Sequence, residues 1–208
     1  MVARPSGGRK VAGSSPASPT ISLPPYPTLR GPRGGPVRRC LTMTGVLPCQ
    51  TLRQLWSSGA IAADAPPLAD QVQPASVDLR LGDTAYRVRA SFLAGAGRPV
   101  AQRLADFEMH RIDLTHGAVL EKGCVYLVPL MERLALPDAL EGVANAKSST
   151  GRLDLLTRTI TDGGTEFDRI PPGYAGPLYA EICPRSFSVL VRPGMRLNQL
   201  RLRQGAAR

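Results

Sequence analysis

The sequence has few of the residues that form metal centres and disulfide frameworks. It contains four cysteines and two histidines in 208 residues, and the cysteines, at positions 40, 49, 124 and 183, form no C-x-x-C pair. This spacing is not typical of a zinc knuckle or of a fold stabilised by several disulfide bonds. We therefore expect reduced thiols in a cytoplasmic protein.

Long apolar runs are missing as well. No stretch of the chain approaches the roughly 20 consecutive apolar residues that cross a bilayer. The N-terminal segment also lacks the apolar core of a secretory signal. We expect neither a membrane partner nor export.

Acidic residues are absent from the first 42 positions, although this segment contains seven Arg and Lys side chains. The remaining residues carry 19 basic against 16 acidic side chains, so most of the +10 net charge comes from the leader. A segment rich in Pro, Gly, Ser and Arg buries too little apolar surface to fold. We expect residues 1–42 to be a disordered basic leader, with Met43 as an alternative start. A nucleic-acid-binding arm is the less favoured alternative, and no nucleic-acid partner is expected.

The periodicity of apolar residues predicts one short helix followed by many short strands. Leu52, Leu55 and Trp56 have helical spacing between Pro48 and Gly59. The segments rich in Val, Ile, Leu and Tyr that follow, each bounded by Gly, Pro or Asp, are 76–81, 85–90, 118–120, 125–130, 177–182 and 188–191. Segment 153–161 is compatible with a strand or with irregular structure. Frequent turns between short strands favour a mostly β domain, a sandwich or barrel, over residues 43–208.

Six consecutive residues have the composition of a phosphate site. Lys147-Ser148-Ser149-Thr150-Gly151-Arg152 combines two cations, three hydroxyls and a glycine. Hydroxyls and backbone N–H groups donate to phosphate oxygens, and Arg adds a bidentate fork. The same composition is equally compatible with a solvated turn. It is not a Walker loop, because the order of glycine and lysine differs.

A second segment, Phe167–Ile182, places a carboxylate on an apolar strand. Alternation along a strand puts Tyr179 and Glu181 on one face and Leu178, Ala180 and Ile182 on the other. A carboxylate in such surroundings is suited to proton transfer. The structural alternative is a glutamate on an edge strand, paired with a surface arginine.

Two further segments favour structural roles. Gln73–Gly82 is a turn that runs into a strand, in which we expect Asp78 to fix a loop or form an ion pair. Arg192–Leu200 is a turn followed by an alternating strand, typical of a closing strand of the core.

In combination, the four segments resemble the dCTP deaminase branch of the dUTPase-like superfamily. The residues that match the family's patterns are Pro74 to Leu81 for P-x-S-x-D-L-R-L, Lys147, Ser148, Ser149 and Arg152 for R-S-S-x-x-R, Pro172, Gly173, Tyr174, Gly176 and Glu181 for P-G-[WY]-x-G and its glutamate, and Pro193, Gly194, Met195, Leu197 and Gln199 for P-G-M-x-[IL]-x-Q. The resemblance covers residues 43–204. It implies a dUTPase-like distorted β-barrel or jelly-roll with one short N-terminal helix.

The resemblance also implies an activity, the conversion of dCTP to dUTP and ammonia. Glu181 would be the catalytic acid/base, with Ser148 holding the water and Arg152 orienting the site. The residues that would bind the nucleotide and its phosphates are Lys147, Ser149, Arg169, Asp168, Phe167, Tyr174 and Gln199. Mg²⁺ would accompany the triphosphate, and the protein would self-associate as a homotrimer or pseudo-trimer with its sites between subunits.

A zinc mechanism does not fit the sequence. Zinc-dependent deaminases use H-x-E followed by P-C-x-x-C. His110 is followed by Arg111 and Ile112, and neither His110 nor His116 belongs to such a motif. We expect both histidines to be surface or structural groups and no zinc to be bound.

The chain departs from the family pattern at three places. Lys147 replaces the family's Arg, and Pro171 stands where the family has an Asp that contacts the sugar, with Asp168 as a candidate substitute. The chain also ends soon after the last predicted strand. We expect a C-terminally truncated domain that corresponds to the first unit of a longer tandem form. Two alternative functions stay open: dUTP diphosphatase, alone or coupled to deamination, and a non-catalytic nucleotide-binding module.

Overall fold

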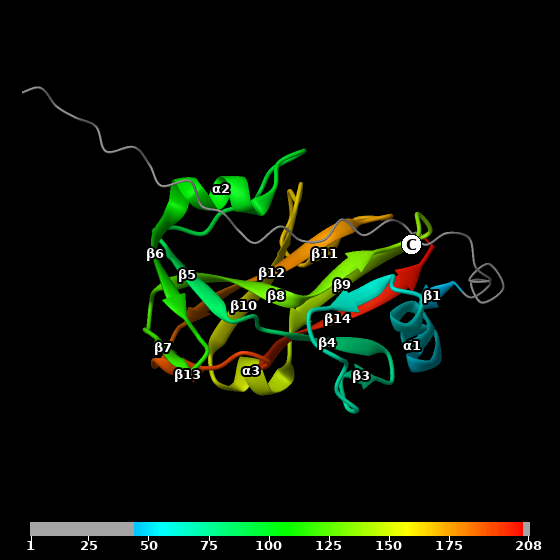
Figure 1. The fold of residues 1–208 in the computed structure, drawn as a ribbon, viewed down its shortest axis with the longest axis horizontal. Coiled ribbons are helices and arrows are strands. Elements are labelled where there is room, and N and C mark those ends of the chain that lie inside the picture. The colour runs from blue at the N-terminus through cyan, green and yellow to red at the C-terminus, as the bar shows by residue number, and fades with distance from the viewer. Residues whose placement is uncertain (1–43, 206–208) are drawn as a thin grey trace, which may run out of the picture.

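The computed structural model describes residues 44–205, and these form two packed antiparallel sheets with three short helices at their margins (Figure 1). The predicted leader lies outside the described residues. The first sheet has the order β11-β9-β14-β4-β3, with β1 also paired to β14. Its strands are β1 (Gly45–Val46), β3 (Val72–Gln73), β4 (Ser76–Arg80), β9 (Leu140–Ala146), β11 (Arg169–Ile170) and β14 (Arg196–Gln204).

The second sheet has the order β10-β12-β8-β5-β6, with β2 also paired to β8. Its strands are β2 (Ile61–Ala63), β5 (Thr84–Val88), β6 (Glu108–Asp113), β8 (Val125–Ala135), β10 (Leu155–Thr161) and β12 (Ala175–Pro184). A separate two-stranded ribbon pairs β7 (Ala118–Leu120) with β13 (Val189–Val191). The prediction of a mostly β, jelly-roll-like domain is confirmed, and segment 153–161 is resolved as strand over most of its length.

The predicted N-terminal helix is α1 (Cys49–Ser57). Leu52 and Leu55 are buried in the core, and Trp56 packs against it. Two further helices, α2 (Val100–Phe107) and α3 (Ser148–Arg152), were not predicted. No helix in the described region has the length and apolar content needed to cross a bilayer.

Strand β12 separates two hydrophobic cores. Leu178, Ala180 and Ile182 belong to the core between the sheets. Tyr179 belongs to a second cluster on the outer face, which the segment carrying Phe92, Ala94 and α2 covers. The predicted alternation along this strand is confirmed, and it directs Glu181 to the face of Tyr179 because residues two apart share a face.

A buried polar network anchors the loop before β3. Glu132 on β8 is fully buried and accepts three hydrogen bonds of 2.7 Å, from the backbone N–H of Arg80, the Arg80 Nε–H and the Gln71 side-chain amide. The same guanidinium donates to the carbonyl oxygens of Ala65 and Pro66, at 2.9 and 2.8 Å. Burial raises the pKa of the Glu132 carboxyl. One charged pair therefore joins both sheets to a loop without periodic structure of its own.

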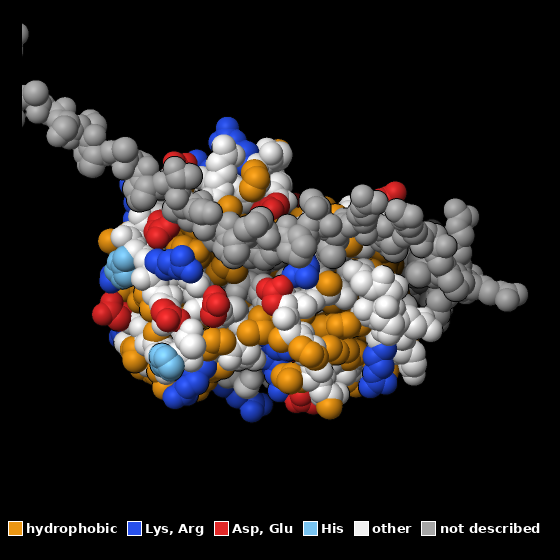
Figure 2. Space-filling model, viewed as in Figure 1, with side chains coloured by type: hydrophobic (Ala, Val, Ile, Leu, Met, Phe, Trp, Pro, Cys, Tyr) orange, Lys and Arg blue, Asp and Glu red, His pale blue; other side chains and the backbone are white. Residues whose placement is uncertain are grey.

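Charge is spread over the surface of the folded part. Figure 2 shows acidic and basic side chains interspersed on the visible face. The three described cysteines, at 49, 124 and 183, are free thiols. Both histidines are exposed.

Candidate functional site

Glu181 is a buried carboxylate in the middle of a sheet. Its strand, β12, lies between β10 and β8, so the alternative of an edge-strand position is wrong. The side chain is 3% exposed and pairs with Arg158, the residue directly opposite on β10. The Arg158 Nε–H donates to Oε1 at 3.0 Å, and one Nη2 hydrogen donates to the same oxygen. No hydrogen bond from the described residues reaches Oε2, which leaves one carboxylate oxygen available to a bound molecule.

Arg158 is held from two other sides. Its guanidinium carbon lies 3.8 Å from the centre of the Phe167 ring, a cation–π contact, and its Nη2 donates to the Ser91 hydroxyl at 3.0 Å. Phe167 belongs to the loop between β10 and β11, and Ser91 to the segment before α2. The guanidinium thus connects Glu181 to two loops that lie beside it.

Asp168 completes this group of residues. It has a φ of 62°, in the left-handed region, which Asp tolerates better than most residues. Its Oδ1 accepts from the Thr159 N–H at 2.7 Å, and its own N–H donates to the Thr159 carbonyl at 2.8 Å. Burial raises the pKa of Asp168, and the Arg158 charge opposes the rise. The structure therefore brings Phe167, Asp168 and Glu181 together, as the sequence-based hypothesis requires.

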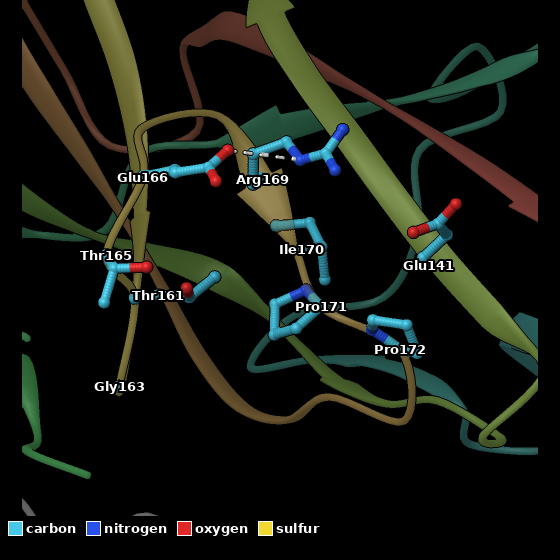
Figure 3. Close-up of a pocket in the computed structure, with 10 residues that line it drawn as sticks. Glu141, Thr161, Gly163, Thr165, Glu166, Arg169, Ile170, Pro171 and Pro172 are labelled. Carbon is cyan, nitrogen blue, oxygen red and sulfur yellow. Dashed lines mark ion pairs between the residues drawn. The ribbon is translucent and has the colours of Figure 1, made fainter. Parts of the chain in front are cut away.

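A cavity of about 210 Å³ opens beside the same loop (Figure 3). Its lining residues are Glu141, Thr161, Gly163, Gly164, Thr165, Glu166, Arg169, Ile170, Pro171 and Pro172. Figure 3 shows Arg169 reaching between Glu166 and Glu141, and its Nε lies 3.5 Å from a Glu166 carboxylate oxygen. The Arg169 side chain is half exposed, so it can contact a ligand from solvent. Pro171, which replaces the family's Asp, lines this cavity as an exposed residue.

Lys147 faces inward. Its ammonium pairs with Asp78 Oδ2, whose side chain is 1% exposed, and the Arg196 guanidinium lies 3.6 Å from the same oxygen. Arg196 also donates to Asp70 at 2.8 Å, and this contact lowers the pKa of Asp70. The expected structural role of Asp78 in an ion pair is confirmed. The charge of Lys147 is therefore partly balanced within the chain.

Ser148, Ser149 and Arg152 lie exposed on α3. The helix is anchored to β14, because the Lys147 N–H and the Thr150 hydroxyl both donate to the Leu197 carbonyl, at 2.9 and 3.0 Å. These exposed groups form a polar surface with the hydrogen-bonding capacity of a phosphate site.

The remaining two candidates have identified partners. The Tyr174 ring is buried, and its hydroxyl accepts from the Asp162 N–H at 3.0 Å and donates to the Pro177 carbonyl at 2.6 Å. Tyr174 therefore fixes the start of the 162–168 loop, and its hydroxyl is occupied. Gln199 lies on β14 opposite Asp78 and accepts a 3.4 Å hydrogen bond from Ser76.

Most of the candidate residues fall into two groups, while Arg169 lies at the cavity and Tyr174 and Gln199 have the partners given above. Arg158, Phe167, Asp168 and Glu181 form the carboxylate group, and the α3 residues with Lys147 form the second, the α3 group. Within the described part of the chain no hydrogen bond or ion pair joins Glu181 to Ser148 or Arg152. Arg158 was not predicted from the sequence. It is an arginine in the middle of β10, a strand otherwise made of Leu, Ile and Thr, and this contrast could have indicated a specific partner.

No cluster of His, Cys, Asp or Glu suited to a metal occurs in residues 44–205. A divalent cation carried on nucleotide phosphates needs few protein ligands, because Mg²⁺ usually keeps phosphate and water oxygens.

Comparison with known families gives one match that spans most of the chain. The model of the 2′-deoxycytidine 5′-triphosphate deaminase (DCD) N-terminal domain matches residues 43–206.

Individual proteins agree with this match. A crystal structure of 2′-deoxycytidine 5′-triphosphate deaminase from Agrobacterium tumefaciens is 56% identical, with a TM-score of 0.77 over 79% of this chain and 50% of that one. This chain therefore spans half the length of that protein. A "dCTP deaminase, dUMP-forming" from Beutenbergia cavernae is 31% identical over 69% of this chain and 71% of its own. A "dCTP deaminase" from Halorubrum lacusprofundi is 32% identical over 62% of both chains.

Proposed function

The chain belongs to the family of dCTP deaminase N-terminal domains, and from this premise we propose that it hydrolyses dCTP to dUTP and ammonia without zinc. The observation that carries the proposal is Glu181, a carboxylate 3% exposed, with one oxygen held by Arg158 and the other free of hydrogen bonds from the described residues. Such a group is suited to general acid/base catalysis, which needs a fixed proton carrier beside the reacting atoms.

The reaction requires three proton movements around one carbon. Glu181 takes a proton from water as the water oxygen bonds to C4 of cytosine, and it passes this proton to N3 of the ring. The tetrahedral intermediate then collapses: the new C4 hydroxyl gives its proton through Glu181 to the amino group, the C4–N bond breaks, ammonia leaves and the C4 carbonyl of uracil forms. Ser148 would hold the water and Arg152 would orient the site, as preorganised donors for the developing charge.

Self-association accounts for the separation of the two residue groups. The proposed reaction needs Glu181 and Ser148 at one C4 atom, whereas the two lie in different groups of the folded chain. A second copy, or a second unit of a longer protein, would bring its α3 group to the carboxylate group of the first. Ser149, Arg169 and Lys147 would bind the triphosphate, and Mg²⁺ would bind to its phosphates.

A second candidate is the coupled reaction that ends at dUMP. Several relatives at 31–36% identity carry the name "dCTP deaminase, dUMP-forming". This activity would require a second water to attack the α-phosphate of dUTP, with pyrophosphate as the leaving group. The buried position of Glu181 beside Phe167 and Asp168, which would bind the nucleotide, favours deamination as its first role.

The test is incubation of the full chain with dCTP and Mg²⁺, with ammonia and nucleotides measured over time. We expect ammonia and dUTP in equal amounts, lost in Glu181→Gln and unaffected by removing or adding zinc. Accumulation of dUMP and pyrophosphate would replace the first proposal with the coupled reaction. Binding of dCTP without any product would favour a nucleotide-binding module, and no binding would overturn the proposal.

A further inference from the structure

We infer that Arg158 is a positioning residue that sets the catalytic geometry of Glu181 and couples it to the loop that carries Phe167 and Asp168. The inference rests on the proposed function and extends it to a residue that the family motifs do not include. Arg158 acts through Glu181, and no contact of its own with the nucleotide is required.

Glu181 is a buried charge that needs a partner. A carboxylate that is 3% exposed loses most of its hydration, and an unpaired buried charge costs several kcal/mol. Arg158 offsets this cost with two donors aimed at one oxygen. The guanidinium is planar and permanently charged, so it fixes the orientation of the carboxylate as well as balancing its charge.

Arg158 engages one oxygen of the Glu181 carboxylate. Both Arg158 hydrogen bonds end on Oε1, and the residues described here give Oε2 none. A symmetric fork would engage both oxygens, whereas this pairing leaves all the lone pairs of Oε2 to a bound water. The one-sided pairing fixes the rotation of the Glu181 side chain and presents Oε2 as the proton-transfer atom.

Neighbouring side chains hold Arg158 in place. Phe167 stacks on the guanidinium at 3.8 Å, and the Ser91 hydroxyl accepts from it at 3.0 Å. A planar guanidinium between an aromatic face and a hydroxyl has little freedom to turn. Phe167 precedes Asp168, whose Oδ1 is fixed by the Thr159 backbone. A shift of this loop on nucleotide binding would therefore be transmitted to Glu181 through the Arg158 side chain.

The test compares kcat and KM for dCTP in four variants of the full chain. Misplacing a reacting group by about 1 Å costs on the order of 100-fold in rate. We expect Arg158→Ala to lower kcat about 30- to 100-fold with KM changed less than about threefold. Arg158→Lys keeps the charge but loses the fork and the flat stacking surface, and should recover only part of the loss. Phe167→Leu should lower kcat in the same direction, by about three- to tenfold, because it removes the stacking partner.

The matched control is Arg87→Ala. Arg87 lies on β5 of the same sheet, its side chain is also 30% exposed, and it pairs with Glu121 at 3.2 Å. We expect kcat and KM of this variant to stay at wild-type values. Free guanidinium ion added to Arg158→Ala supplies a second readout: it should restore part of kcat, and it should not restore Arg87→Ala or Glu181→Gln beyond their starting activity.

The outcomes separate the two proposals. If the wild-type chain fails to deaminate dCTP, the proposed function falls and this inference falls with it. If the wild type is active and Glu181→Gln is not, but Arg158→Ala retains the wild-type kcat, the positioning role alone is overturned. A loss in Arg158→Ala that appears entirely in KM, or that guanidinium does not relieve, also overturns it, because either result would indicate a binding or a folding role.

Discussion

Glu132→Gln should destabilise the fold far more than the loss of a comparable but partly exposed ion pair. Glutamine matches glutamate in shape but has one acceptor oxygen where Glu132 uses two, at 2.7 Å from each of three donors. In the variant the amide nitrogen faces a donor, and the fully buried carboxylate no longer balances Arg80, which is 3% exposed. Breaking a buried pair on one side costs about 3–5 kcal/mol.

The assay is urea unfolding at neutral pH, followed by far-ultraviolet circular dichroism. With a slope of about 2 kcal/mol per molar urea, the expected loss lowers the midpoint by about 1.5–2.5 M. The matched control is Glu141→Gln, since Glu141 pairs with Arg203 at the same 2.7 Å but with side chains 16% and 22% exposed. Its loss should be about 1 kcal/mol or less. Equal midpoint shifts in the two variants would refute the argument from burial.

Two further predictions concern the loop beside Glu181. Tyr174→Phe leaves the Asp162 N–H and the Pro177 carbonyl without their partner, so we expect a loss of about 1–3 kcal/mol in urea unfolding; an unchanged midpoint would show that water replaces the hydroxyl. Asp168→Asn tests the titration of a carboxyl whose folded pKa burial raises above the unfolded value of about 3.9. Such a group stabilises the fold fully below the unfolded pKa and loses this contribution as pH rises through the folded pKa. The stability of wild type relative to Asp168→Asn should therefore fall as pH rises above about 4, and a difference that grows with pH would contradict the assignment.

Several strands of this domain could be predicted from the sequence because their periodicity is local, whereas β6 (Glu108–Asp113) and β9 (Leu140–Ala146) were not predicted. The alternation around Glu181 predicted both faces of β12, and the cluster at Leu52, Leu55 and Trp56 predicted α1. Helix α2 also carried a signal, since Val100 and Leu104 have helical spacing after a proline, but the segment is short and lies among glycines.

The pairing of side chains far apart in the chain could not be predicted. Arg158 meets Glu181 only because β10 and β12 pair in one register across a loop whose conformation no periodicity encodes. Lys147 reaches Asp78 across 69 residues. The sequence motif indicated a cation for phosphate, whereas the fold places that cation against a buried carboxylate. Composition identifies which groups could act, and register decides which of them meet.

The β-bulge in β12 has a consequence for the tolerance of the gene to insertions and deletions. The register between β12 and β8 shifts between Pro177 and Tyr179, and the pairing is regular from there to Ile182. Length changes before the bulge can be absorbed in a turn. A single-codon deletion after it would reverse the strand faces and send the Glu181 carboxylate among leucines. Natural variants with indels in this stretch should therefore be confined to the side of Pro177 that precedes the bulge.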